Sequence, residues 1–423
     1  MIIPSIDLIG GRAVQLIGGE AEAIDAGDPR PILSRFSLAG EVTIIDIDAA
    51  RGEGSNNELI SQLCRQASIR VGGGIRDVET AIDWLDRGAA KVILGTAATP
   101  QILSQLPTER VIVALDSRHG ELVTHGWRHN TGASVMDRIA ELRGLCGGFL
   151  VTFVELEGRM GGTDLERARP IIEAAGDTPV TIAGGVATTD EISDLDRVGA
   201  DAQVGMALYS GRITLSEAIA ASLNSEGADG LWPTVVVDER GVALGLAWSS
   251  ADSLNQAVQR RRGIYQSRSR GLWEKGATSG STQELLRVDV DCDRDAIRFT
   301  VRQHGDGFCH LSNRSCWGQD RGVGRLSRRL AQIADGPPPK GSNTAKLLKD
   351  DALLGAKLRE EADELATATS RENVIAEAAD VLYFTLVKAA ASGVGVTDIE
   401  CELDRRALRV KRRPMQANRE NIG

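Results

Sequence analysis

Val71-Gly72-Gly73-Gly74-Ile75 is followed, 111 positions later, by the similar stretch Ile182-Ala183-Gly184-Gly185-Val186. A second glycine element follows each stretch at an offset of 110, as Gly95-Thr96-Ala97 and Gly205-Met206-Ala207. Apolar runs that end in aspartate head both halves, at residues 3–7 and 111–116. These concordant offsets indicate a duplicated half-barrel. About 220 residues is also the right length for eight βα units. We therefore predict a (βα)8 barrel over residues 1–222.

The composition narrows the class of protein. A chain of 423 residues is too long for one hydrophobic core, and 42% apolar with 26% charged residues is typical of a globular protein. The net charge of -10 argues against a nucleic-acid partner. No apolar run approaches the roughly 20 residues that span a bilayer. Six cysteines in this length do not form a disulfide framework, so we expect a cytoplasmic protein.

The chain divides into sections where the pattern of apolar and polar residues changes. Residues 1–222 alternate short apolar runs with helix-like stretches such as residues 77–88, as expected for βαβ units. The polar, glycine-bearing residues 223–230 are interpreted as a linker. Residues 231–319 are rich in predicted strands, and residues 325–413 are helical in pattern. We therefore expect an α/β barrel, then a β-rich α+β domain, then an all-α domain.

The β-rich domain has an acidic residue at every second position from Asp289 to Asp295. In a strand, alternate residues share a face, so Asp289, Asp291, Asp293 and Asp295 would lie on one side and Cys292 on the other. Such carboxylates repel one another, and a hard divalent cation would neutralise them. The alternative is a solvated edge strand.

Three cysteines of the same domain form a possible metal site. Cys309 and Cys316 lie in a short glycine-bearing loop beside His310, and Cys292 would be a third thiolate. Three protein ligands with one open position are typical of a catalytic zinc, which supplies hydroxide near neutral pH. The alternative is that these are free, buried cysteines.

These motifs, together with Ser267-Arg268-Ser269-Arg270 and Leu272-Trp273-Glu274-Lys275-Gly276-Ala277-Thr278-Ser279-Gly280, resemble phosphoribosyl-AMP cyclohydrolase. The resemblance implies Zn²⁺ on Cys292, Cys309 and Cys316 across a dimer interface, and thus a homodimer. It implies Mg²⁺ on Asp291, Asp293 and Asp295, and substrate contacts from Arg268, Arg270, Lys275 and Ser279. Ala277 departs from the family, which has Glu there.

The helical domain carries two acidic stretches, one with Glu360, Glu361 and Glu364 and one with Glu377 and Asp380. Spacings of three and four place carboxylates on one helix face. A helical hairpin could bring both faces to one Mg²⁺ ion. The alternative, for either helix alone, is a solvated acidic face.

With Gly341-Ser342-Asn343-Thr344-Ala345-Lys346-Leu347, these stretches resemble phosphoribosyl-ATP pyrophosphohydrolase over residues 326–413. The resemblance implies Mg²⁺ on Glu361, Glu364, Glu377 and Asp380, a substrate contact from Lys346, and release of pyrophosphate. Lys340 stands where the family has Glu, and Asn343 where it has Tyr.

In the barrel, Asp7 and Asp116 would face each other across the mouth and supply a general base and a general acid. Backbone N–H groups beside the paired glycines would hold a substrate with a phosphate at each end. The phosphate-binding candidates are Gly73, Gly74, Gly95, Thr96, Gly184, Gly185 and Gly205. The alternative is that the glycines only make tight strand-to-helix turns.

As a set, these barrel residues resemble the phosphoribosylformimino-aminoimidazole-carboxamide ribotide isomerase family. The resemblance implies catalytic roles for Asp7 and Asp116 and a supporting one for the Thr152 hydroxyl. Departures are Gln15 in place of arginine, Ala49 in place of glycine, and Glu157-Gly158-Arg159 near a usual Asp-Gly-Thr loop. An inactive barrel that serves as a scaffold or dimerisation domain is the alternative. The three resemblances imply consecutive steps of histidine biosynthesis on phosphoribosyl nucleotides.

Overall fold

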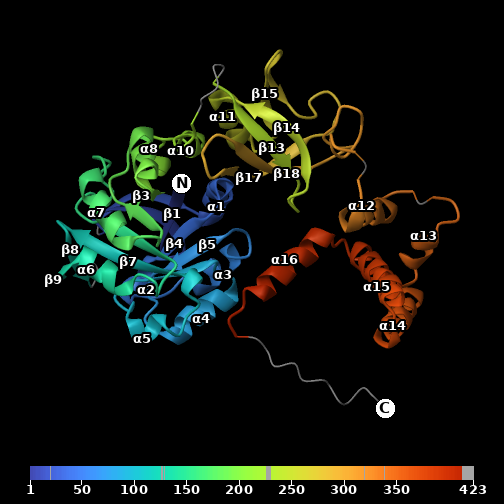
Figure 1. Ribbon diagram of the computed structural model, residues 1–423, viewed down its shortest axis with the longest axis horizontal. Helices are drawn as coiled ribbons and strands as arrows, with labels where there is room; N and C mark the ends of the chain where they lie inside the picture. Colours follow the sequence, from blue (N-terminus) through green and yellow to red (C-terminus); the bar gives the residue numbers. More distant parts are fainter. Residues whose placement is uncertain are drawn as a thin grey trace. The chain divides into compact units, whose positions relative to one another are not determined.

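The computed structural model describes residues 1–19, 21–124, 127, 129–224, 230–318, 320–337 and 339–411 (Figure 1). The chain divides into two compact units. The larger contains Met1–Phe308 and the described residues from Leu408 onward, and the smaller is Cys309–Ala407. Most of the predicted linker, residues 225–229, lies outside the described residues. The predicted barrel and residues 231–308 of the predicted β-rich domain are parts of the same unit, whereas the last residues of that predicted domain, from Cys309, belong to the smaller unit.

Eight parallel strands of the larger unit close into the predicted barrel. In spatial order they are β1 (Ile2–Ile9), β4 (Val42–Asp46), β5 (Ile69–Gly72), β6 (Lys91–Leu94), β7 (Val111–Arg118), β10 (Gly148–Phe153), β11 (Val180–Ala183) and β12 (Ala200–Val204). Pairing of β12 with β1 completes the ring. Three strands separate β1 from β7 on either side, so these two strands lie opposite each other.

Helices follow most of the barrel strands, as expected from the βαβ pattern. They are α1 (Pro29–Phe36), α2 (Ile47–Arg51), α3 (Asn57–Leu63), α4 (Val78–Arg87), α5 (Pro100–Leu103), α6 (Val135–Leu142), α7 (Leu165–Ala175), α8 (Thr189–Arg197), α9 (Met206–Tyr209) and α10 (Leu215–Ala220). The helix expected at residues 77–88 is confirmed as α4. Asp77 caps its start by accepting from the Thr80 N–H, and Gly88 ends it in a left-handed conformation.

The internal repeat is visible in the structure. An antiparallel hairpin follows the first strand of each half: β2 (Arg12–Ile17) with β3 (Ala21–Gly27), and β8 (Glu121–Thr124) with β9 (His129–Ser134). The matching glycines also share a conformation, with φ of 96° and 98° at Gly73 and Gly184. The duplication predicted from sequence offsets therefore extends to the backbone.

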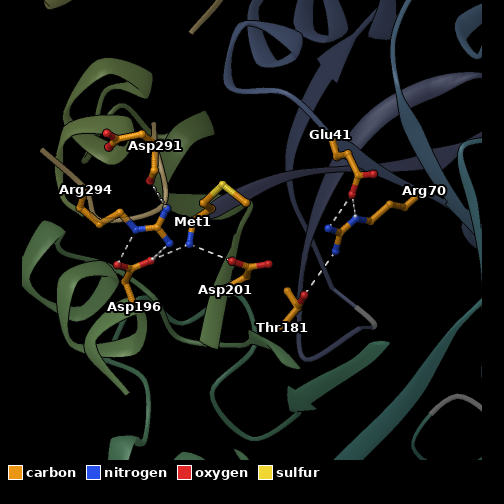
Figure 2. A network of polar contacts seen from close by, with 8 residues as sticks. All are labelled: Met1, Glu41, Arg70, Thr181, Asp196, Asp201, Asp291 and Arg294. Atoms are coloured by element: carbon orange, nitrogen blue, oxygen red, sulfur yellow. Dashed lines mark hydrogen bonds and ion pairs between the residues drawn. The ribbon is translucent and has the colours of Figure 1, made fainter. Parts of the chain in front are cut away.

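The barrel interior is apolar in its middle and charged at the N-terminal ends of its strands, here called the barrel floor. Ile93, Ile112, Leu150 and Ala183 form a small inner core. At the N-terminal ends of the strands, the buried Arg70 contacts Glu41 at 2.6 Å and donates to the Thr181 hydroxyl at 3.3 Å (Figure 2). Arg70 and Thr181 are 111 positions apart, which is the offset of the repeat.

The β-rich part of the larger unit is a four-stranded sheet with order β14-β13-β18-β17. Its elements are β13 (Trp232–Val237), β14 (Ala243–Ser249), α11 (Ala251–Arg260), β17 (Gln283–Val290) and β18 (Ile297–Gln303), with a separate hairpin of β15 (Ile264–Ser267) and β16 (Gly271–Glu274). The fully buried Tyr265 anchors the hairpin, since its hydroxyl donates to Gln283 at 2.6 Å.

The smaller unit is helical, as predicted. It contains α12 (Gly322–Asp335), α13 (Asn343–Leu347), α14 (Asp351–Thr367), α15 (Arg371–Ala391) and α16 (Val396–Ala407), with α14 packed along α15. Its core consists of Leu330, Leu347, Leu354, Leu386, Val387 and Val396. Among the described residues, none of the helices combines the length and the apolar character needed to span a bilayer.

Candidate active sites

The predicted catalytic residues of the barrel lie at the C-terminal ends of its strands. Asp7 is near the end of β1, and Asp116 is near the end of the opposite strand β7. Thr152 of β10 pairs in register with Asp116, and its side chain hydrogen-bonds the Asp116 carboxyl. The C-terminal ends of strands form the end of a (βα)8 barrel where active sites are built.

Burial changes the acid–base properties of these groups. It raises the pKa of Asp7 to about 7. It also raises the pKa of Asp116, although hydrogen bonds from Trp127 and Thr152 oppose that effect. A carboxyl with a pKa near neutrality, such as Asp7, can both accept and donate a proton, so the mouth is suited to proton transfer.

Glu157 is a third carboxyl of the mouth that the sequence interpretation treated only as part of an altered loop. Burial, followed by repulsion from Asp7 and Asp116, raises the pKa of Glu157 to about 8. The loop is hydrogen-bonded to the turn after β2, since the Glu157 carbonyl accepts from the Gly18 N–H at 3.2 Å. One signal was available in the sequence, because an acidic residue here stands close to the aspartate of the usual Asp-Gly-Thr loop.

Glu157→Gln is expected to stabilise the larger unit at alkaline pH. The pKa of Glu157 is about 8 in the folded chain and 4.5 ordinarily, so the folded state alone keeps the proton between these values. Stability therefore falls as pH rises from about 4.5 to 8, and glutamine removes that loss. The thermal midpoint should rise by about 2 °C or more at pH 8.5 and change little at pH 4. An equal shift at both pH values, or the same shift in the exposed-site control Glu166→Gln, would contradict this.

The candidate phosphate-binding glycines occupy two matching turns. Gly73 and Gly74 follow β5, Gly184 and Gly185 follow β11, and all four have positive φ. A side chain would also collide with backbone, since a Cβ at Gly73 would lie 2.2 Å from the Asp46 carbonyl oxygen. The turns therefore require glycine for conformational reasons alone. Phosphate binding stays a prediction.

The two glycine sets differ in what surrounds them. Gly95 and Thr96 are exposed. Gly205 lies against Gln15, whose amide oxygen would be 2.6 Å from a Cβ at that glycine. A cavity of only about 20 Å³ remains beside Gly184, Gly185 and Gly205. The second predicted phosphate position is thus partly filled by Gln15 and by the loop that contains Glu157 and Gly158.

The predicted strand of alternating aspartates is wrong in its local structure. Strand β17 ends at Val290, and residues 291–296 form the turn into β18, with Arg294 in a left-handed conformation at φ 65°. The Asp291 carboxylate accepts from the N–H groups of Asp295 and Ala296 at 3.1 Å each, which closes the turn. A strand would have left these N–H groups to a neighbouring strand, whereas the turn satisfies them locally.

The turn nevertheless gathers three of the predicted ligands. Carboxylate oxygens of Asp291, Asp293 and Asp295 lie within 4.8 Å of one another. Asp289 stays on β17 and pairs with Arg287 and Arg298 instead. The three clustered carboxylates offer the oxygen donors that Mg²⁺ prefers.

The predicted substrate contacts of this domain lie around the β15–β16 hairpin. The Arg268 guanidinium stacks 4.8 Å from the Trp248 ring centroid, and Arg270 is exposed in the hairpin turn. Lys275 is buried, with its ammonium 6.0 Å from the Phe308 ring centroid. Ser279 is exposed, as is Ala277 at the departure from the family.

The predicted zinc ligands are distributed over both units. Cys292 is exposed in the turn after β17, in the larger unit. Cys309 and Cys316 belong to the smaller unit, where the Cys309 sulfur accepts from the Leu311 N–H at 3.5 Å. The zinc assignment stays a prediction.

The helical unit brings its acidic stretches together, as predicted. Ligand oxygens of Glu361 and Glu364 on α14 and Glu377 on α15 lie within 4.8 Å of one another. Asp380 is near enough for its charge to raise the pKa of Glu361 and of Glu377, but it lies outside this closest group. Glu360 is not in this group and pairs with Lys357 at 2.8 Å; the same ammonium lies 3.9 Å from Glu361. The predicted substrate contact, Lys346 of α13, is exposed.

The electrostatics of this cluster favour a cation. Burial, then repulsion from neighbouring carboxylates, raises the pKa of both Glu361 and Glu377. Glu361 is 9% exposed, and the Lys357 ammonium, 3.9 Å from its carboxylate, offsets the repulsion from the other carboxylates only in part. A divalent cation would remove the repulsion, and the donor set fits Mg²⁺.

Comparison with known protein families assigns each part of the chain. Residues 1–214 match the family described as "Histidine biosynthesis protein", residues 245–318 match "Phosphoribosyl-AMP cyclohydrolase", and residues 323–407 match "Phosphoribosyl-ATP pyrophosphohydrolase". The chain therefore belongs to the histidine biosynthesis protein family and carries cyclohydrolase and pyrophosphohydrolase domains behind its barrel.

Curated relatives agree with this assignment. A "Histidine biosynthesis trifunctional protein" of Neurospora crassa is 37% identical over 80% of this chain and 37% of its own length. A histidine biosynthesis bifunctional protein of Schizosaccharomyces pombe is 46% identical over 48% of each chain. An imidazole-4-carboxamide isomerase of Haloarcula marismortui is 38% identical over 52% of this chain and 95% of its own. The chain thus spans less than half the length of the two fungal relatives.

Proposed function

We propose that the chain catalyses three reactions of histidine biosynthesis. In reaction order, these are hydrolysis of phosphoribosyl-ATP to phosphoribosyl-AMP and pyrophosphate, opening of the adenine ring, and isomerisation of the resulting carboxamide ribotide. The observation that carries the proposal is the meeting of Glu361, Glu364 and Glu377, because two separate helices supply the carboxylates that the first reaction needs. The order of the domains along the chain is the reverse of this reaction order.

The helical unit supports the first step. Glu361, Glu364, Glu377 and Asp380 would hold Mg²⁺, which supplies positive charge to the phosphate oxygens and orients the attacking water. Lys346 would contribute a further positive charge to the triphosphate. The raised pKa values of Glu361 and Glu377 fit residues whose mutual repulsion a bound cation would reduce.

The β-rich part supports the second step. Cys292, Cys309 and Cys316 would hold Zn²⁺, which supplies hydroxide for attack on the purine ring. Asp291, Asp293 and Asp295 would hold Mg²⁺. Arg268, Arg270, Lys275 and Ser279 would bind the substrate phosphate and ribose, since cationic and hydroxyl donors suit phosphate oxygens.

The barrel supports the third step through its three carboxyls. Asp7, with the pKa near 7, would take the proton, and Asp116, held by Trp127 and Thr152, would donate one. The observation that favours a scaffold role instead is the filling of the second phosphate position by Gln15 and the Glu157 loop. We favour catalysis because buried carboxyls without a function would only destabilise the mouth.

The proposal is tested by assaying the purified chain with each intermediate in turn. Phosphoribosyl-ATP should yield pyrophosphate, phosphoribosyl-AMP should yield the opened-ring product, and that product should isomerise. Failure of either hydrolytic step under metal-replete conditions would overturn the corresponding domain assignment. Failure of isomerisation alone would establish the scaffold alternative.

We expect one tightly bound zinc per chain, lost in Cys309→Ser. Loss of one of three thiolate ligands leaves too few donors for a stable site. Metal analysis of the purified proteins measures this, with Cys401→Ser as the control because Cys401 is an exposed cysteine of α16. Unchanged zinc in Cys309→Ser would refute that ligand.

We further propose that the protein is a homodimer in the cytoplasm. The helical unit supports association, since α15 exposes Val374, Ile375 and Leu382. Apolar side chains gathered on one helix are typical of surfaces that pack against a partner. A strictly monomeric protein with full cyclohydrolase activity would contradict a zinc site completed across a dimer.

A further inference from the structure

The turn that carries Asp291, Asp293 and Asp295 is held by residues of the barrel (Figure 2). Arg294, between two of these aspartates, makes a bidentate contact with Asp196 of α8, with N–O distances of 2.8 and 3.1 Å. The same guanidinium donates to the Asp291 carbonyl at 3.2 Å. One side chain therefore links the barrel to the backbone of the turn.

The start of the predicted linker also hydrogen-bonds the backbone of the turn. Asn224, just beyond α10, donates its N–H to the Arg294 carbonyl at 2.7 Å. Its side-chain amide donates to the Asp293 carbonyl at 3.3 Å. Three backbone carbonyls of the turn thus accept hydrogen bonds: those of Asp293 and Arg294 from Asn224, and that of Asp291 from Arg294, the ion-pair partner of Asp196.

The placement of Asp196 has a local cost that its contacts with Arg294 and with the Met1 amino group offset. It lies in the last turn of α8, where the helix dipole disfavours negative charge. Burial alone would raise the pKa of Asp196, but hydrogen bonds from the Met1 amino group and from Arg294 outweigh it and hold that pKa below its usual value. The carboxylate is 14% exposed and the guanidinium 23%, so solvent screens the pair only in part.

Packing between the barrel and β17 is incomplete beside the turn. Between the barrel floor and β17 lies a cavity of about 450 Å³. It is lined on the barrel side by Arg70, Lys91 and Phe149 and on the other side by Val288 and Asp289. β17 packs against the barrel at Ser37–Ala39, but side chains do not interdigitate across the cavity, so the polar contacts at its edge add to that packing in locating the turn.

We propose that the barrel and the first residues of the linker position the metal-binding turn of the cyclohydrolase domain, with Asp196 and Asn224 as positioning residues that act through Arg294 and the turn backbone. The proposal rests on the proposed cyclohydrolase function for the identity of the metal. Partners of this kind, which orient a ligand without touching the metal, commonly change metal affinity by about 10- to 100-fold. The barrel would then serve the cyclohydrolase reaction whether or not it isomerises substrate.

The test uses the full chain with Glu361, Glu364 and Glu377 changed to Gln, so that Mn²⁺ cannot occupy the helical cluster. Into this background we would introduce Asp196→Asn or Arg294→Asn. Asparagine tolerates the left-handed conformation at position 294, so the second variant removes the guanidinium but keeps the turn. Asp194→Asn is the matched control, because Asp194 lies on the same helix and pairs with Arg197.

Two measurements separate the possible outcomes. Mn²⁺ titration followed by electron paramagnetic resonance should show about tenfold weaker binding in Asp196→Asn and Arg294→Asn but not in Asp194→Asn. Hydrogen exchange should be faster at the Asp295 and Ala296 amides in the same two variants. Unchanged binding and unchanged exchange would overturn the proposal while leaving the metal assignment in place. Faster exchange in a background that binds no Mn²⁺ at the turn would support positioning and overturn the metal assignment instead.

Discussion

Replacing Glu361 with glutamine should reduce pyrophosphate release from phosphoribosyl-ATP by about 10³-fold or more. Glu361 is the buried member of the cluster with Glu364 and Glu377, and an amide cannot supply the charge that a Mg²⁺ ligand needs. Losing metal-derived charge stabilisation of several kcal/mol corresponds to about this factor in rate. Pyrophosphate release at saturating substrate, measured over a range of Mg²⁺ concentrations, gives the result.

The chain offers a close control one residue away. Glu360 is 49% exposed at its side chain and pairs with Lys357, so Glu360→Gln should retain nearly full activity. Asp380→Asn should lose activity as well, because its charge reaches both Glu361 and Glu377. Undiminished turnover in Glu361→Gln with an intact fold would remove the pyrophosphohydrolase assignment.

Asp7→Asn should lower isomerisation of the opened-ring intermediate by about 10²-fold or more and leave both hydrolytic steps intact. Asparagine keeps the shape of the side chain but cannot take a proton. Because burial raises the pKa of Asp7 to about 7, kcat/KM of the unaltered chain should also rise with pH through neutrality, as Asp7 becomes ionised. Steady-state rates measured over about one and a half pH units on either side of the Asp7 pKa, from about pH 5.5 to about pH 8.5, test both statements.

Asp25→Asn is the control for this variant, since Asp25 of the β2–β3 arm is exposed and pairs with Arg12. Absence of isomerisation in the unaltered chain, with normal hydrolysis, would show that the barrel is a scaffold. Combining Gln15→Arg with an Asp-Gly-Thr sequence at residues 157–159 would then test whether phosphate binding and loop closure had been lost.

Much of the fold was predictable because its signals are local or repeated. Helix α4 follows from its N-cap Asp77 and its terminal Gly88, and the barrel follows from glycine elements at offsets of 110 and 111. The Glu-x-x-Glu pair also follows from helical spacing, since Glu361 and Glu364 must share a face. That α15 would bring Glu377 to the same point was a hypothesis, and the structure confirms it.

The aspartate motif shows where such reasoning fails. Alternation in sequence is compatible with a strand or with a turn, and the outcome depends on whether hydrogen bonds from neighbouring strands are available. Pairing of β17 with β18 ends at Val290. The N–H groups of Asp295 and Ala296 therefore hydrogen-bond to the Asp291 side chain instead of to a neighbouring strand. The three carboxylates still lie close together, because of the turn and not because of a shared strand face.

The sequence by itself determined the barrel, the helical unit and the identity of the main acidic clusters, because periodicity and repetition act over short distances along the chain. Only the tertiary structure decided that Glu157 joins Asp7 and Asp116 in the mouth, and that Gln15 lies against Gly205. It alone revealed the pair between Asp196 and Arg294, which are 98 positions apart. Such contacts arise from how whole elements pack, and burial then sets the charge of each group, so no local pattern encodes them.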